Sequence, residues 1–309
     1  MKKWLLVLLL APFLAAAQDK LSEKNYRIYS VREGKEVSLM DVAAAMDNFD
    51  VLFFGEEHND SVTHFLERSM LEALYGRYNK ELALSMEMFE RDVQPVMNEY
   101  LGGFIREKNF VKDGRAWSNY RDYKPMVEFA KDKGLDVVCA NAAGRYSNLA
   151  GRKGQQALMQ LPDASKAFFA PLPYDTAQGD YYRKLTGLAD HGPAPIADSS
   201  KTKAAPVMNM GGFNLVMGQS LWDATMAYSI AQYRKRNKHK KIMQVNGKFH
   251  SDEHFAAAAQ LKNYSPKTKM IVISTASDDD FPNVKWAEYA KMGDYIIITD
   301  PKVPRTYKD

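Results

Sequence analysis

Cysteine is almost absent from this sequence, which contains a single one, Cys139, among its 309 residues. One cysteine excludes an intrachain disulfide framework and any cysteine-rich metal site. Its neighbours in the run Leu135–Ala140 are mostly apolar, so we expect Cys139 to be a small buried side chain. The nucleophile motif G-x-S-x-G is also missing. A hydrolase built on this chain would therefore use an activated water as its attacking group.

Long apolar runs are lacking as well. The most apolar stretch, Trp4 to Leu14, is shorter than the roughly 20 residues that a membrane-spanning helix needs. Two lysines precede it and three alanines ending at Ala17 follow it, an arrangement typical of an export signal. We therefore expect residues 1–17 to be a signal peptide cleaved near Ala17, and the rest of the chain to be periplasmic or associated with the cell envelope. No lipid-bearing cysteine follows the apolar stretch, and no transmembrane segment is expected.

The sequence has no large excess of either charge. Its 42 basic residues face 38 acidic ones, with a formal net charge of +4. The one long basic tract, Arg234 to Lys241, is expected at the exposed end of a helix, where the helix dipole favours cations. No basic stripe with interleaved aromatic side chains accompanies it, so we expect no nucleic-acid partner.

Apolar strand-like runs alternate with helical patterns from residue 51 to the C-terminus. A short edge hairpin is expected before them, between Tyr26 and Leu39. The alternation predicts an α/β fold, with a mostly parallel sheet and helices on both faces. Strands are expected at Val51–Phe54, Leu82–Met86, Leu135–Ala140, Ile242–Val245, Met270–Ser274 and Tyr295–Thr299, and helices near 41–48, 61–78, 93–101, 125–133, 250–262 and 284–291.

Residues from about 146 to 240 break this alternation. They contain a polar helical stretch, a middle rich in proline, glycine and alanine, and a long helix expected at Leu215–Arg236. A long interval without strands is uncommon inside a compact domain. We therefore predict one domain over residues 18–309 that carries a mostly helical insertion at about 146–240, serving as a lid or a dimerisation arm.

Polar side chains follow the predicted strands at the point where each strand ends. Glu56 and His58 follow the first strand, Glu87 follows the second, and His250 comes shortly after a later one. Because the carboxyl ends of parallel strands meet at one edge of a sheet, we expect these four side chains to share a pocket. Two carboxylates and two imidazoles suit general acid–base catalysis or the binding of a divalent metal. Asn141 ends a further strand at the same edge, and Asn246 directly follows the strand that precedes His250.

Two other interpretations apply to parts of this pattern. Asn59 and Asp60 also suit the capping of a helix start, a role without catalytic meaning. The segment from His250 to His254 matches H-x-x-E-H, the inverted zincin pattern, which on a helix would place two metal-binding histidines on one face. That pattern needs a carboxylate ligand well downstream, where Glu288 is the one remaining glutamate. Metal binding by His250 and His254, with His58 nearby, is an alternative that depends on such a carboxylate.

Five segments of the chain resemble the motifs of the ChaN-like haem-binding family, which belongs to a wider group with Tiki proteases and erythromycin esterases. Their order and spacing extend the resemblance over most of the chain. They are FGEEHND at 54–60, EMFERDVQ at 87–94, Trp117 with YRDYKP at 120–125, ANA at 140–142, and Asn246-Gly247 with His250.

The resemblance implies an exported haem-binding protein that serves iron acquisition, with outer-membrane haem-uptake components as partners. It also implies a homodimer, formed with or without its ligand, in which two haems stack face to face and are ligated through tyrosine with help from histidine. A tyrosine phenolate can hold ferric haem, and an arginine can pair with a propionate. The family's axial tyrosine has no aligned counterpart here, so the candidates for haem binding are Tyr174, Tyr181, Tyr182, Arg183, His191 and Tyr228.

Haem binding in an iron-uptake or haem-trafficking pathway is thus the main functional hypothesis. The alternative is a hydrolase that activates water with Glu56, His58, Glu87 and His250, with or without a divalent metal, because these residues are similar to the catalytic set of the hydrolytic relatives. A third hypothesis is an interaction protein of the cell envelope that retains a relic of such a site.

Overall fold

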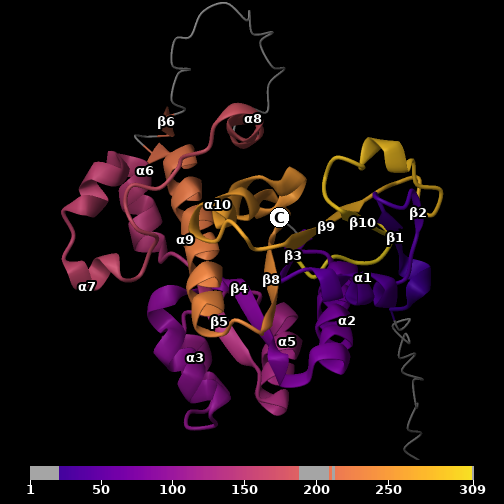
Figure 1. Cartoon of the computed structure of the whole chain (residues 1–309), viewed down its shortest axis with the longest axis horizontal. Coiled ribbons are helices and arrows are strands. Elements are labelled where there is room, and N and C mark those ends of the chain that lie inside the picture. The colour runs from indigo at the N-terminus through magenta and orange to yellow at the C-terminus, as the bar shows by residue number, and fades with distance from the viewer. Residues whose placement is uncertain (1–20, 188–208, 211–212, 308–309) are drawn as a thin grey trace, which may run out of the picture.

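A computed structural model describes residues 21–187, 209–210 and 213–307 of the chain. The predicted signal peptide and His191 lie outside these residues. At the centre is an eight-stranded sheet in the order β2-β1-β10-β9-β3-β8-β4-β5 (Figure 1). Its strands are β1 (Tyr26–Ser30), β2 (Lys35–Glu36), β3 (Val51–Glu56), β4 (Leu82–Glu90), β5 (Asp136–Asn141), β8 (Lys241–Gly247), β9 (Met270–Ser277) and β10 (Tyr295–Thr299).

Six neighbouring strands, from β10 to β5, run parallel, while β1 and β2 form an antiparallel hairpin at one edge. This arrangement confirms the predicted α/β fold with a mostly parallel sheet. The central strands are apolar because both of their faces are covered. In β3, Leu52 and Phe54 join one core cluster and Val51 and Phe53 join another, as the two-residue period of a strand requires.

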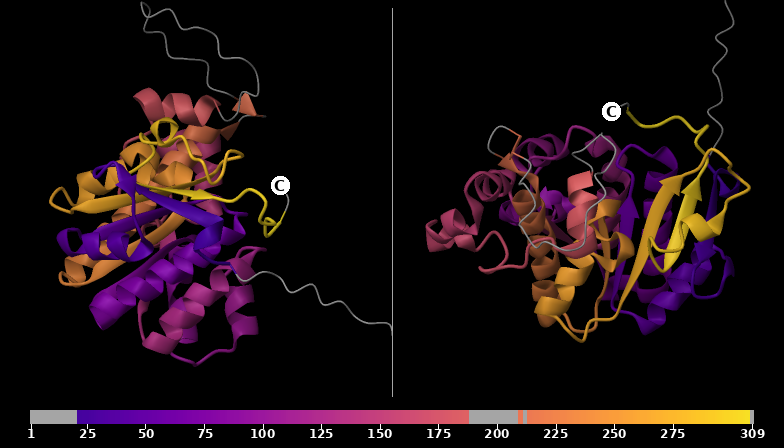
Figure 2. Two further views of the ribbon diagram at one scale, coloured as in Figure 1. Left: turned by 90° about the vertical axis from the view of Figure 1, so that its right-hand side faces the viewer. Right: turned by 90° about the horizontal axis from the view of Figure 1, so that it is seen from above.

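Helices cover both faces of the sheet. One layer contains α1, α2, α3, α4 and α5, and the opposite face is covered by α9 and α10. Figure 2 shows the indigo-to-magenta helices on one side of the strands and the orange ones on the other. The helices of these two layers are α1 (Leu39–Ala45), α2 (Ser61–Tyr78), α3 (Gln94–Leu101), α4 (Glu107–Asp113), α5 (Tyr120–Lys133), α9 (Leu215–Arg236) and α10 (Ala256–Tyr264).

The predicted insertion divides into two parts. Its last helix, α9, packs directly on the sheet through Met226, Ala227 and Ile230. The remainder lies outside α9 and packs through two separate apolar clusters, one around Tyr146 and Phe169 and one that joins Tyr181 and Leu185 to Ala256. It consists of α6 (Gly144–Met159), α7 (Asp163–Lys166), α8 (Gly179–Gly187) and the two-stranded pair β6 (Asn209–Met210) and β7 (Phe213–Asn214).

Two predicted helices differ in the structure. The helix expected from residue 250 begins only at Ala256, and residues 248–254 form two short 3-10 turns, η5 (Lys248–His250) and η6 (Asp252–His254). The helix expected near 284–291 is reduced to the 3-10 turn η7 (Trp286–Glu288). That segment is short, so packing rather than helix propensity decides its conformation.

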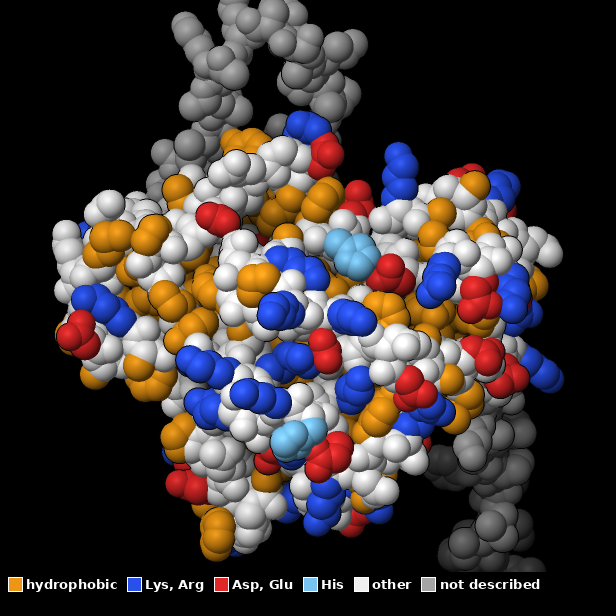
Figure 3. All heavy atoms as spheres, in the orientation of Figure 1, with side chains coloured by type: hydrophobic (Ala, Val, Ile, Leu, Met, Phe, Trp, Pro, Cys, Tyr) orange, Lys and Arg blue, Asp and Glu red, His pale blue; other side chains and the backbone are white. Residues whose placement is uncertain are grey.

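Charged side chains of both signs cover the face of the molecule in Figure 3, where lysines and arginines in the middle have acidic neighbours. The basic tract at the end of α9 is partly neutralised, since Arg234 pairs with Asp50 and Lys240 pairs with Asp136. Within the described part of the chain, no helix is long and apolar enough to span a membrane.

Candidate functional site

The register of the central strands fixes where the site lies. Glu56 at the end of β3 is level with Gly247 of β8, and Met86 of β4 is level with Val245 on the other side of β8. Glu87, the next residue of β4, therefore lies beside the same end of β8. The strands β3 and β4 follow each other in the chain but are separated in the sheet by β8. Ligands of open α/β sheets bind at such a change of strand order, outside the carboxyl ends.

A cavity of about 430 Å³ opens at this edge of the sheet, and the structure brings Glu56, His58, Glu87 and His250 together in its lining. This volume suits a small-molecule ligand. Much of the remaining lining is aromatic or aliphatic and comes from several elements, including α8, α9 and the C-terminal segment. These side chains are Trp117, Leu185, Leu215, Trp222, Phe249 and Tyr307.

Glu56 is the most enclosed acid of the cavity, with 1% of its surface exposed. Its Oε1 atom lies 2.6 Å from Nδ1 of His58 and accepts a hydrogen bond of 2.7 Å from the hydroxyl of Tyr123. Burial alone would raise the pKa of Glu56, but the bonds from His58 and Glu67 and the charge of His64 outweigh it and hold that pKa at about 2. Glu56 is therefore an anion that fixes the ring of His58 at the cavity wall.

His250 lies between two buried carboxylates. Its Nδ1 atom is 2.6 Å from Oδ1 of Asp223, and its Nε2 atom is 3.4 Å from Oε1 of Glu87. The hydroxyl of Tyr181 donates to the other oxygen of Asp223 at 2.7 Å, and the backbone N–H of Gly247 donates to Glu87 at 2.7 Å. Burial would lower the pKa of His250, but the two carboxylates outweigh it and raise that pKa to about 10. His250 is consequently an imidazolium at neutral pH.

The charge of His250 predicts how stability changes with pH. The pKa of the folded chain, about 10, exceeds the ordinary value of 6.5, so the folded state keeps a proton that the unfolded chain releases. This stabilisation is fully present below pH 6.5 and is lost as the pH rises through 10. We expect the thermal midpoint to fall more steeply between pH 6.5 and 10 in the wild type than in His250→Gln, measured by circular dichroism. Parallel slopes would contradict a charged His250 in the folded state. The titratable side chains around this imidazole are those of Glu87, Asp223, Tyr181 and His58.

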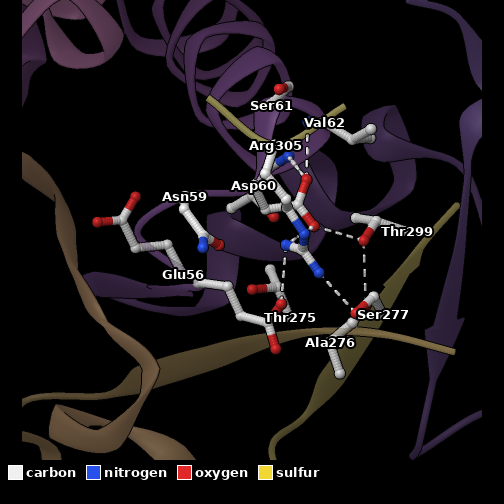
Figure 4. A network of polar contacts seen from close by, with 12 residues as sticks. Glu56, Asn59, Asp60, Ser61, Val62, Thr275, Ala276, Ser277, Thr299 and Arg305 are labelled. Carbon is white, nitrogen blue, oxygen red and sulfur yellow. Dashed lines mark hydrogen bonds and ion pairs between the residues drawn. The ribbon is translucent and has the colours of Figure 1, made fainter. Parts of the chain in front are cut away.

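Asp60 has a structural role. It caps α2, because its Oδ1 atom accepts hydrogen bonds from the backbone N–H groups of Val62 at 2.8 Å and Thr63 at 3.0 Å. Its Oδ2 atom accepts a bond from Thr299 at 2.5 Å and pairs with Arg305 at 2.9 Å (Figure 4). The capping interpretation of Asp60 is thereby confirmed.

The C-terminal segment is fastened beside the cavity by the same ion pairs. Arg305 also pairs with Glu57 at 3.0 Å, and Glu57 in turn accepts a bond of 2.7 Å from Lys248. The backbone N–H of Thr306 donates to the carbonyl of Asn59 at 2.9 Å. These contacts hold the chain so that the next residue, Tyr307, lines the cavity.

Residues 42–261 match the family described as haem-binding uptake, Tiki superfamily, ChaN. This chain belongs to the ChaN family. The match spans well over half of the sequence and confirms the resemblance that the motifs at the strand ends indicated.

The comparison with solved structures finds two similar chains, and the first of them shares the fold. One described as cofacial heme binding to ChaN of Campylobacter jejuni has a TM-score of 0.65 and 15% sequence identity, and covers 90% of this chain and 98% of that one. A second, of the type III effector HopBA1, has a TM-score of 0.43 and 13% identity over 85% of this chain and 94% of that one. Among curated proteins, no sequence match is found.

The tyrosines considered as haem ligands of this ChaN-family protein lie in different places. Tyr174 is buried in the cluster outside α9, and the ring of Tyr228 packs on that of Tyr264. Tyr181 is buried, and its bond to Asp223 and its burial both raise the pKa of its hydroxyl, which opposes a phenolate. Tyr182 is half-buried on α8, one turn before Leu185 of the cavity wall.

Arg183 is exposed on the same helix and pairs with Asp180. His254 does not share a helical face with His250. Glu253 and His254 both have positive φ angles, 59° and 58°, which interrupt any helix through this segment. The half-exposed side chain of His254 instead pairs with Asp294 at 3.2 Å. The helical geometry required by the H-x-x-E-H interpretation is therefore wrong for these residues.

The two asparagines at strand ends stabilise the backbone. A register shift between Met86 and Glu90 places Asn141 level with Glu90, and its side chain accepts a bond from the backbone of Ala142 at 2.8 Å. Asn246 donates to the carbonyl of Gly247 and to the hydroxyl of Ser251, both at 3.0 Å. Neither asparagine lines the cavity.

Several residues of the site had no counterpart in the sequence analysis. Asp223 contacts His250. The sequence did offer a signal for it, because Asp223 is the only charged residue of α9 before Arg234. Glu67 also had a signal, since it stands on the apolar stripe of α2 between Thr63 and Met70. No local signal marks Trp222 or Tyr307, which reach the cavity only through the tertiary fold.

Proposed function

We propose that this ChaN-family protein binds haem in the cavity at the carboxyl edge of its sheet. The observation that carries the proposal is the lining, in which two indole rings, two further aromatic rings and two leucines surround a set of ionisable side chains. A porphyrin has large apolar faces, a central iron and two carboxylates at one edge. Apolar walls with a few fixed polar groups are what such a ligand requires.

The donors of the cavity fit ferric haem. His58 is the partly exposed imidazole, with 38% of its side chain accessible, and Glu56 fixes its orientation. Tyr307 lines the cavity, and Tyr182 precedes Leu185 of the cavity wall by three residues, so we propose one of these two phenols as the iron ligand. Lys248 at the wall and Arg183 on α8 carry charges that suit the propionates. Bound iron would supply the Lewis acid to which a phenolate or imidazole attaches.

Replacing Trp222 by alanine tests the cavity as the haem site. Trp222 lines the cavity, and losing the burial of a large apolar side chain costs about 1.5–3 kcal/mol of binding. We expect ferric haem to bind roughly tenfold to a hundredfold more weakly, measured by titration of the Soret band. Trp286→Ala is the matched control, since Trp286 stacks on Tyr29 at 4.8 Å and does not line the cavity.

The same titration identifies the iron ligand. Loss of the charge-transfer bands in Tyr307→Phe or Tyr182→Phe would assign the phenol, and Tyr228→Phe should leave them unchanged. An unshifted Soret band of the wild type at stoichiometric haem, or equal losses in Trp222→Ala and Trp286→Ala, would refute binding at this site.

We further propose that the protein is exported and acts in haem or iron acquisition as a homodimer. The export proposal is supported by the N-terminal pattern of two lysines, an apolar stretch and three alanines. The dimer proposal is supported by the similar structure of ChaN from Campylobacter jejuni, which is described as showing cofacial heme binding, since two facing haems would bring two copies together. Outer-membrane haem-uptake components are the corresponding partners.

The hydrolase alternative has less support from the charges of the site. A general base must be free of its proton at the working pH. His250 is held as an imidazolium by Glu87 and Asp223, and the pKa of His58 is raised by Glu56 and Glu87 despite its burial. Glu56, with a pKa of about 2, is a weak base. The cavity is thus better suited to holding a ligand than to activating water.

A further inference from the structure

A second group of ionisable side chains lies behind the cavity, between β3 and α2. It consists of Glu56, His64 and Glu67, which expose 1%, 7% and 0% of their surfaces. One donor atom from each lies within 4.8 Å of the other two. Glu56 also lines the cavity, whereas His64 and Glu67 do not. The ring of Tyr123 meets that of His64 edge to face at 5.1 Å.

One ring nitrogen of His64 faces a backbone carbonyl, away from the two carboxylates. Its Nε2 atom lies 3.1 Å from the backbone carbonyl of His58, an acceptor that requires an N–H on that nitrogen. A ring that keeps only this proton directs the lone pair of Nδ1 toward Glu56 and Glu67, whereas a doubly protonated ring, the state whose charge acts on Glu56, would donate from Nδ1 to them. In metal sites, a histidine ligand usually donates the N–H of its other ring nitrogen to a carboxylate, a backbone carbonyl or water.

The spacing of the three acceptors matches the spacing around a metal ion. Nδ1 of His64 is 3.3 Å from Oε2 of Glu56 and 3.1 Å from Oε2 of Glu67. Donors bound at about 2.1 Å around a tetrahedral ion lie roughly 3.4 Å apart. Moreover, when Glu67 carries no proton, Oε2 of Glu56 and Oε1 of Glu67 are buried without a hydrogen-bond donor, so both carboxylates have unused acceptor capacity.

We propose that Glu56, His64 and Glu67 form a binding site for a divalent transition-metal ion of the Zn²⁺ type. Two carboxylates and one imidazole are ligands that such an ion accepts. The ion would neutralise the buried acids and, through Glu56, fix His58 at the cavity wall. The site shares Glu56 with the cavity but is distinct from the haem proposal, because its other two ligands, His64 and Glu67, do not line the cavity.

The competing arrangement is a proton shared between the two acids. Burial and the nearby charge of Glu56 raise the pKa of Glu67 well above its ordinary value, so Glu67 takes up a proton when no cation is present. The two arrangements predict opposite effects of Glu67→Gln on the site. Glutamine keeps the volume and can donate to Glu56, so it reproduces the protonated acid but weakens a metal site.

The test is the zinc content of the full chain, expressed without a histidine tag. Because the site is buried, Zn²⁺ is supplied both during expression and during refolding from urea, and metal is counted by mass spectrometry after dialysis. We expect about one equivalent in the wild type and at least tenfold less in Glu67→Gln. Glu72→Gln, on the same helix in an exposed pair with Arg68, should keep the full content.

Wild-type protein with less than a tenth of an equivalent under both conditions would overturn the proposal. So would a Glu67→Gln variant that keeps its zinc while Glu87→Gln loses it, since the ion would then lie in the cavity. If Glu67→Gln does not fold, the visible spectrum of the wild type loaded with Co²⁺ decides, because bands of a low-coordinate site with nitrogen and oxygen ligands must be present. Haem titration of the same samples is read independently, so either proposal can fail alone.

Discussion

Replacing Asp223 by asparagine is expected to lower the free energy of unfolding by about 3 kcal/mol. Asp223 is 1% exposed and accepts hydrogen bonds from both His250 and Tyr181. An amide in its place turns one of these contacts into two facing donors and leaves His250 with a single anionic neighbour. Removing one partner of a buried ion pair usually costs 3–5 kcal/mol, and the remaining charge of Glu87 places this change at the lower end.

Urea unfolding followed by circular dichroism measures this loss. Asp180→Asn is the control, because Asp180 is an exposed residue of α8 whose pair with Arg183 lies in solvent, and its change should stay within about 0.5 kcal/mol. The Asp223 variant should also lose most of the stability change between pH 6.5 and 10 that His250 causes. Equal stability of the two variants would show that the hydrogen bonds joining Tyr181, Asp223 and His250 contribute little to the free energy of unfolding.

Replacing Gly55 by alanine is expected to destabilise the fold by about 1–3 kcal/mol. An added Cβ atom would lie 2.9 Å from the hydroxyl oxygen of Ser251, 3.0 Å from Cα of Lys248 and 3.2 Å from the carbonyl oxygen of Ile273. Two of these atoms belong to the backbone of neighbouring elements and cannot rotate away. β3 must therefore shift between β8 and β9, and Glu56 at its end shifts with it.

Gly76→Ala provides a control of opposite sign. Gly76 is exposed in the interior of α2, and a Cβ atom there would have no heavy atom within 4 Å. Alanine in a helix interior is more stable than glycine by about 0.5–1 kcal/mol, so this variant should unfold at higher urea concentration than the wild type. A Gly55→Ala variant as stable as the wild type would contradict the close packing of β3 against the turn that follows β8.

The elements of the sheet could be predicted from the sequence because their signals are local. The alternation of apolar runs with amphipathic stretches identified β3, α2, β4 and β8 within a few residues of their observed ends. The capping of α2 by Asp60 was one of the two interpretations that its sequence position allowed. The conformation of residues 248–254 could not be predicted, because the positive φ angles of Glu253 and His254 depend on contacts such as the bond from Glu253 to the carbonyl of Met292.

The residues of the site were likewise predictable only in part. Glu56, His58, Glu87 and His250 follow buried strands, and parallel strands bring such residues to one edge without further information. No comparable rule predicts where the candidate haem ligands lie in the fold. Tyr181 lies in the middle of the predicted insertion, where no helix was expected, yet it stands on a helix and its hydroxyl is buried against Asp223 from another helix. Tyr307 lines the cavity only because Arg305 pairs with Glu57 and Asp60 across the sheet edge.

By itself, the sequence determined the α/β alternation, the edge of the sheet where polar groups gather, and membership of the ChaN family, because each depends on residue types at short, fixed spacings. Only the tertiary structure decided which aromatic rings enclose the cavity, that His250 lies between two acids, and that Glu56, His64 and Glu67 converge behind it. These arrangements join residues from different strands and helices, and their distances depend on packing that no local pattern encodes.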